Sequence, residues 1–170
     1  ANKGQQVKAW EMLKKRLQDD NYVSEADLFS RTRNWENPLL AVKAGQGFIE
    51  RLIESKDFRT AWNILEFCFE ANQGDYKLLS GETVLALSSR AETRNHKSIM
   101  VTILTHFEKD FPNHPQTTAA LLTAARFTAH DLDNFEGGRE IIAHLQSTYP
   151  EIRGDKTFQA LSTILMEQDS

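Results

Sequence analysis

The sequence contains few of the residues that make tight turns or crosslinks. It has 8 glycines, 4 prolines and 1 cysteine among 170 residues. So few glycines and prolines argue against a many-stranded β fold, which needs frequent turns. The single cysteine, Cys68, excludes an internal disulfide and a cysteine-based zinc cage. No apolar run reaches the roughly 18–20 residues that span a bilayer, so we expect no membrane insertion by this segment.

The charge balance disfavours nucleic acid as a partner. Lysine and arginine total 20 against 24 acidic residues, which gives a net charge of −4. Such a chain has no general positive field for phosphate backbones. The hydrophobic fraction of 40% is typical of a folded globular chain. The chain begins Ala-Asn-Lys without an apolar signal segment, and we expect a mature or excised piece; the soluble part of a longer, membrane-anchored protein is one option.

Motifs for catalysis or cofactor binding are also scarce. None of the five histidines is placed in a His-Glu-x-x-His motif or another metal-ligand spacing. Gly45-Gln46-Gly47 lacks the third glycine and the preceding strand of a dinucleotide loop. There is no phosphate-binding loop and no nucleophile elbow. We therefore expect no enzyme activity, no cofactor and no metal, and a buried, inert thiol at Cys68.

Apolar residues instead recur at helical spacing along the whole chain. We predict one all-α structural domain in three parts: an N-terminal helix and polar loop over 1–37, three helical hairpins over 38–150, and a C-terminal capping helix within 151–170. The capping-box spacing at Asp133–Glu136 predicts one helix start. The expected helices cover residues 38–54 and 58–71, 79–92 and 96–110, 115–130 and 135–148, and 156–166.

The second helices of the three hairpins share one pattern. A residue and the ones four and seven places later align in each: Ala61, Leu65 and Cys68; Met100, Leu104 and Phe107; Gly138, Ile142 and Leu145. The leading positions lie 39 and 38 residues apart, and a proline follows twelve residues after two of them, at Pro112 and Pro150. A period of this size with two helices per unit is typical of a helical solenoid.

The segment Leu132-Asp-Asn-Phe135-Glu-Gly-Gly138-Arg-Glu-Ile-Ile142 resembles the turn and second helix of tetratricopeptide repeats. The units are longer than the 34 residues usual in that family. The connector Phe111-Pro-Asn-His-Pro115 is similar to connectors in bacterial cell-envelope proteins of the family. The single cysteine is compatible with cytoplasm and periplasm alike, so the bacterial compartment stays open. The resemblance implies a right-handed α-α superhelix whose first helices line a concave groove.

The expected function is non-catalytic binding of a protein or peptide partner in that groove. By alignment with the family, we predict that eight residues line it: Lys43, Gln46, Glu50, Ser89, Glu92, Thr123, Phe127 and His130. For Phe127 the alternative is packing between hairpins.

Two other interpretations stay open. In the first, a terminal helix packs on a second copy, because Phe158, Leu161, Ile164 and Leu165 are many apolar residues for the last helix of an array. A hydrolase or metalloenzyme on an all-α scaffold is the weaker one. A smaller question concerns Gly137-Gly138, which indicates either close approach of another helix or a helix that starts later, at Arg139.

Overall fold

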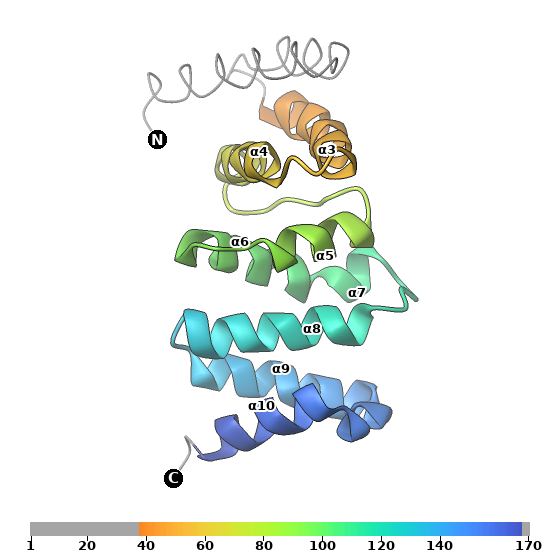
Figure 1. The fold of residues 1–170 in the computed structure, drawn as a ribbon, viewed down its shortest axis with the longest axis vertical. Coiled ribbons are helices and arrows are strands. Elements are labelled where there is room, and N and C mark those ends of the chain that lie inside the picture. The colour runs from red at the N-terminus through yellow and green to blue at the C-terminus, as the bar shows by residue number, and fades with distance from the viewer. Residues whose placement is uncertain (1–37, 168–170) are drawn as a thin grey trace. The chain divides into compact units, whose positions relative to one another are not determined.

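A computed structural model of the chain describes residues 38–167, with side chains from Gly45 onward. The described residues form helices and connecting turns without a strand, which confirms the all-α prediction for this part of the chain (Figure 1). The helix expected near the N-terminus, with Trp10, and the loop around Trp35 lie outside the described residues. The chain divides into two compact units, residues 1–79 and 80–170, which are treated one at a time below.

The described part of the first unit is a helical hairpin. Helix α3 spans Pro38–Glu54 and α4 spans Phe58–Ala71, both as predicted. Asp57 caps α4 by accepting a hydrogen bond from the Thr60 N–H at 3.2 Å. Side chains from both helices are buried against each other, including Phe48, Leu52, Ala61, Trp62 and Leu65, each at most 3% exposed. This apolar contact holds the hairpin together.

Cys68 lies in the same core and is completely buried. Tyr76, from the segment after α4, is 3% exposed and shares a hydrogen bond with the Cys68 thiol. Burial raises the pKa of Cys68 to about 12, with the Tyr76 hydrogen bond acting in the opposite direction. The prediction of a buried thiol is confirmed.

The second unit contains two hairpins and a final helix. Its elements are α5 (Gly81–Ser89), α6 (Arg94–Thr105), α7 (Phe107–Asp110), α8 (Thr117–Arg126), a π-helical turn η1 (Phe127–Asp131), α9 (Phe135–Thr148), a 3₁₀ turn η2 (Pro150–Gly154) and α10 (Lys156–Glu167). Within this unit α8 packs between α6 and α9, and α9 packs on α10 (Figure 1).

Several boundaries differ from the prediction. Helix α5 begins later than expected because the Ser80 hydroxyl caps it, accepting from the Thr83 N–H at 3.2 Å. The helix expected over 96–110 is interrupted at His106, which ends α6. The cap of α9 is Asn134 and not Asp133: the Asn134 side chain accepts from the Gly137 N–H at 2.9 Å. Asp133 instead lies in the turn, with a φ of 54°.

The expected helix over 115–130 ends in a π-helical turn. The Leu132 N–H donates to the carbonyl of Phe127, five residues back, at 3.0 Å. The Thr128 hydroxyl donates to the Ala124 carbonyl at 2.7 Å. Such an insertion rotates the side chains that follow it, so the register of α8 does not continue to Asp131.

The nine equivalent positions of the second helices are all buried. The predicted inward stripe is therefore confirmed. Towards the C-terminus of the second unit, one buried cluster joins α8, the two turns, α9 and α10; it contains Leu121, Leu122, Ala125, Ala129, Ile142, Leu145, Ile152, Phe158, Leu161 and Leu165.

Gly138 marks the closest approach between α9 and the end of α8. A Cβ at this position would lie 2.9 Å from the Ala129 Cβ and 3.3 Å from the Ala125 carbonyl oxygen. Because α9 already begins at Phe135, the later helix start is wrong, and the close-packing interpretation of this glycine is confirmed.

The connector Phe111–Pro115 is fixed by His114. The His114 ring packs edge-on against Phe107, with centroids 5.1 Å apart, and its Nε2 lies 2.9 Å from a Glu82 oxygen at the start of α5. The other ring nitrogen, Nδ1, accepts from the Gln116 N–H at 3.0 Å. A Cβ at Gly81 would come within 2.7 Å of the His114 ring. His114 therefore acts as a loop and cap residue.

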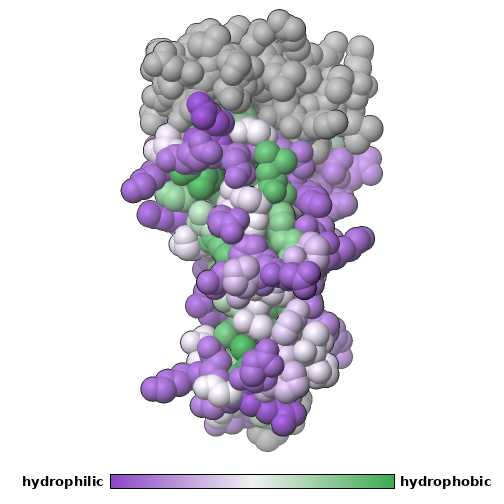
Figure 2. Space-filling model, turned by 90° about the vertical axis from the view of Figure 1, so that its right-hand side faces the viewer, coloured by the Kyte–Doolittle hydropathy of each residue, from purple (hydrophilic) through white to green (hydrophobic). Residues whose placement is uncertain are grey.

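Among residues 38–167, no helix combines the length and apolarity needed to cross a bilayer. On the face seen in Figure 2, hydrophobic side chains form small patches among hydrophilic ones.

Candidate functional site

A hollow of about 270 Å³ lies between α8, the 3₁₀ turn and the start of α10. We call it the α8–α10 hollow. The side chains of Leu122, Ile152 and Leu161 form its apolar floor; they are 5–8% exposed and belong to the core of the second unit. Thr118, Thr123, Arg126, Asp155 and Thr157 add polar groups to its lining. An apolar floor with a polar rim can hold one apolar side chain and hydrogen-bond the chain that carries it.

The charged groups of this hollow are held in place by local contacts. Asp155 caps α10, because its Oδ1 accepts from the Phe158 N–H at 2.9 Å. The Arg126 guanidinium lies over the Phe127 ring, 5.4 Å from its centroid. A cation over an aromatic face keeps its donors available to a ligand while its stem is restrained.

A second and more polar hollow, of about 540 Å³, lies next to the first along α8. We call it the connector hollow. Thr118 lines both hollows, and the connector residues Pro112 and Pro115 and the acidic residues Glu108 and Glu151 line only this one. The two hollows therefore adjoin on the surface of α8.

Glu108 is engaged on both oxygens. The Tyr149 hydroxyl donates to Oε2 at 2.6 Å, and His144 Nε2 lies 2.6 Å from Oε1. Burial acts to raise the pKa of Glu108, but these two hydrogen bonds outweigh it and hold the pKa below its usual value. The same contact, mainly the hydrogen bond to the Glu108 carboxylate, raises the pKa of Tyr149 to about 12. Glu108 is thus a fixed anion of this hollow at neutral pH.

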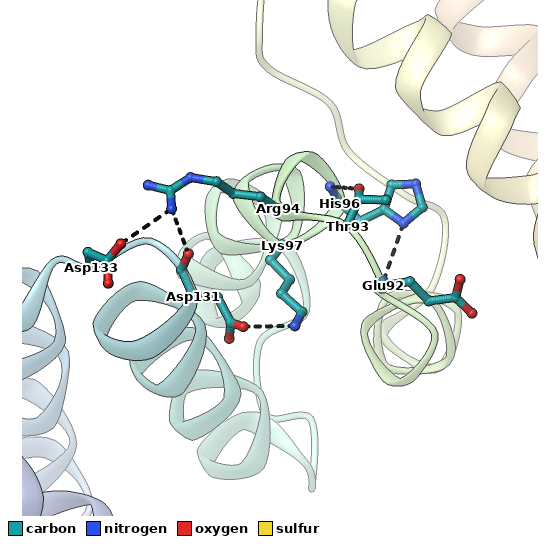
Figure 3. A network of polar contacts seen from close by, with 7 residues as sticks. All are labelled: Glu92, Thr93, Arg94, His96, Lys97, Asp131 and Asp133. Atoms are coloured by element: carbon teal, nitrogen blue, oxygen red, sulfur yellow. Dashed lines mark hydrogen bonds and ion pairs between the residues drawn. The ribbon is translucent and has the colours of Figure 1, made fainter.

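A network of polar contacts joins the start of α6 to the end of the π-helical turn (Figure 3). Lys97 Nζ lies 2.8 Å from an Asp131 oxygen, with both side chains mostly buried, at 23% and 29% exposed. Arg94 pairs with Asp133 at 3.4 Å, and both side chains are well exposed. Since exposed pairs contribute little, the Lys97–Asp131 pair is the stronger link between the hairpins.

The predicted groove residues of the first unit lie on α3. The side chain of Lys43 lies outside the described residues. Gln46 donates from Nε2 to the Lys77 carbonyl, and Glu50 is half-buried.

In the second unit, Thr123 lines the α8–α10 hollow. Ser89 is exposed and donates to the Ala86 carbonyl at 2.7 Å, within its own helix. Glu92 is exposed, and Figure 3 shows its carboxylate pointing away from the other labelled residues. His130 is exposed, with its ring edge-on to Phe135.

Phe127 does not form part of an exposed groove wall. It is 5% exposed, with the Lys97 ammonium 5.7 Å and the Arg126 guanidinium 5.4 Å from its ring centroid. It therefore packs between the hairpins, the alternative left open for it above. Its neighbour Arg126, which the sequence argument missed, lines the hollow instead.

Further lining residues come from the 3₁₀ turn, which the sequence argument treated as a helix end only. Pro150 starts this turn, and Ile152 then points into the core at 7% exposed. The sequence signal for this turn is the apolar residue Ile152, two places after Pro150, which indicates a segment that returns to the core.

Within the described part of the chain, no group of three or more histidine, cysteine, aspartate or glutamate side chains is arranged to hold a metal ion. Comparisons with protein-family models, with curated proteins and with solved structures find no match for this chain.

Proposed function

We propose that this chain is a non-catalytic interaction module of the tetratricopeptide-like helical-repeat type, which binds an extended segment of a partner protein. The observation that carries the proposal is the α8–α10 hollow. Its floor is apolar and its rim carries hydroxyl, carboxylate and guanidinium groups. It is built on α8, a first helix in the repeat alignment, and Thr123 in its rim is one of the predicted groove residues.

The lining of the hollow favours an extended peptide as the ligand. The hollow is open to solvent, and its volume of about 270 Å³ is at the small end of the roughly 300–1,000 Å³ of pockets for drug-sized ligands. One leucine-sized side chain fits into such a space. An extended segment that seats one side chain here and lays its backbone along the threonine rim satisfies both the apolar and the polar groups.

The repeat pattern supports the proposed architecture. All nine equivalent second-helix positions are buried, and in the second unit α8 packs on α6 and α9 while α10 packs on α9. In solenoid proteins, hairpins that pack side by side in this way place their first helices on one face of a superhelix.

The test is selection from a random decapeptide display library with the purified chain. Ala119, an exposed residue that lines the hollow, is replaced by tryptophan to fill it. Ala143 is exposed on α9 outside the two hollows, so Ala143→Trp is the matched control. We expect selected peptides to bind wild type and Ala143→Trp alike and to lose at least tenfold in affinity with Ala119→Trp. Failure to select any peptide, or equal binding by both variants, would overturn the proposal.

The alternative proposal is a structural or oligomerisation role for α10. Ile164 and Met166 favour it, because they are 40% and 66% exposed. They lie two residues apart on a helix, however, and so point in nearly opposite directions. Phe158, Leu161 and Leu165 are buried in the core and so cannot contact a second copy. Sedimentation equilibrium over a hundredfold concentration range would show a rising mass if α10 self-associates; a constant monomer mass rules this role out.

A further inference from the structure

We propose that the partner segment carries an apolar residue and, two or three positions away, a lysine or arginine. The apolar residue occupies the α8–α10 hollow and the basic residue occupies the connector hollow. This inference rests on the proposed function and adds the chemical class of the ligand.

The two hollows differ in charge. The described residues that line the connector hollow include two carboxylates, from Glu108 and Glu151, and no lysine or arginine. In the α8–α10 hollow the positive charge of Arg126 offsets the negative charge of Asp155, so the net charge of this end is close to zero. An extended ligand laid along α8 therefore meets a neutral, apolar site at one end and a negative site at the other.

The two acidic groups have different roles. Both oxygens of Glu108 are within hydrogen-bond distance of Tyr149 and His144, so this carboxylate supplies fixed charge. Glu151 lies two residues after Tyr149 and is exposed at the edge of the same hollow. An exposed carboxylate can turn to meet an ammonium or guanidinium group, so Glu151 is the expected direct contact.

The spacing follows from the geometry of α8. The floor residue Leu122 and the connector-hollow residue Thr117 are five positions apart on the helix. At 1.5 Å per residue this is about 7.5 Å along the axis. An extended chain covers that length in two to three residues at about 3.3 Å each. A separation of two also puts both ligand side chains on the same face of the extended chain.

The test uses the same random decapeptide library with two charge-reversal variants. Glu151→Lys changes the charge of the connector hollow. Glu140→Lys makes the same change in net charge at an exposed position of α9 outside both hollows. Wild type and Glu140→Lys should select peptides with an apolar residue and a Lys or Arg two or three places apart. Glu151→Lys should select peptides that lack the basic residue and carry Asp or Glu instead.

Affinity measurements complete the test. A fluorescein-labelled selected peptide whose basic residue is changed to glutamine should bind wild type about two- to fivefold more weakly, the range for one exposed ion pair. The difference should disappear in 1 M NaCl. If Ala119→Trp blocks binding but selected peptides show no charge preference, or if Glu151→Lys leaves the preference unchanged, this inference fails while the proposed function stands. If no peptide is selected, both fail.

Discussion

Replacement of Gly138 by alanine should destabilise the second unit, although alanine is the better helix former. In a helix interior, Gly→Ala gains about 1 kcal/mol of stability. At Gly138 the new methyl group would lie 3.3 Å from the Ala125 carbonyl oxygen and 2.9 Å from the Ala129 Cβ. A backbone oxygen cannot rotate away, so α9 must shift. Overpacking of this kind costs about 1–3 kcal/mol, which leaves a net loss of up to about 2 kcal/mol.

Gly47 provides the matched control. It also lies inside a helix, and a Cβ there would meet no described atom within 4 Å. Gly47→Ala should therefore stabilise the first unit by up to about 1 kcal/mol. Because the helix-propensity term is common to both variants, the difference between their effects isolates the packing cost at Gly138, about 1–3 kcal/mol.

The assay is urea denaturation followed by two signals. The three tryptophans all belong to residues 1–79, and Trp62 is buried in the hairpin of the first unit, so tryptophan fluorescence follows the unfolding of that hairpin. Far-UV circular dichroism reports the helices of both units. The Gly138 variant should lower the circular dichroism midpoint without a matching change in fluorescence. Equal stabilisation by both alanine variants would refute the close-packing argument.

Three further outcomes follow from the contacts described above. Because the folded-state pKa of Tyr149 is raised to about 12, its hydrogen bond to Glu108 stabilises the fold below pH 10 and is lost as the pH rises towards 12. The difference in melting temperature between wild type and Tyr149→Phe should therefore shrink over that range, and a constant difference would contradict it. A double-mutant cycle of Lys97→Met and Asp131→Asn should give a coupling energy of about 0.5–1 kcal/mol, and zero coupling would show that the pair does not link the hairpins. Cys68, with its pKa raised to about 12, should react with a disulfide reagent at pH 8 at least about a hundredfold more slowly in the folded protein than in guanidinium chloride, and equal rates would refute its burial.

Local signals were sufficient for much of the fold. The predicted bounds of α3, α4 and α9 are correct. Local residues mark two of the helix starts: Pro38 occupies the first position of α3, and Asp57 caps α4. Apolar periodicity then identified the buried stripe, including Gly138, because burial follows directly from the helical repeat of 3.6 residues.

The rest depended on contacts between segments distant in sequence. Nothing local predicts the π-helical turn, which forms where the end of α8 meets α6 and α9. That turn shifts the register of the residues after Phe127. Phe127 itself is buried because it packs between the hairpins, next to Lys97 of α6. The 3₁₀ turn that places Ile152 has the same origin, because its apolar side chain is directed by the core of the second unit.

The pairing of Gly81 with His114 limits how this chain can be cut and rejoined. The His114 imidazole fills the space that any larger residue at Gly81 would need. The connector that follows the α5–α6 hairpin therefore fits only a hairpin that begins with glycine. A chimera that exchanges hairpins must therefore transfer both residues together. A fragment that begins at Ser80 and runs past Pro115 keeps Gly81 and His114 together, whereas a boundary between α7 and His114 separates them.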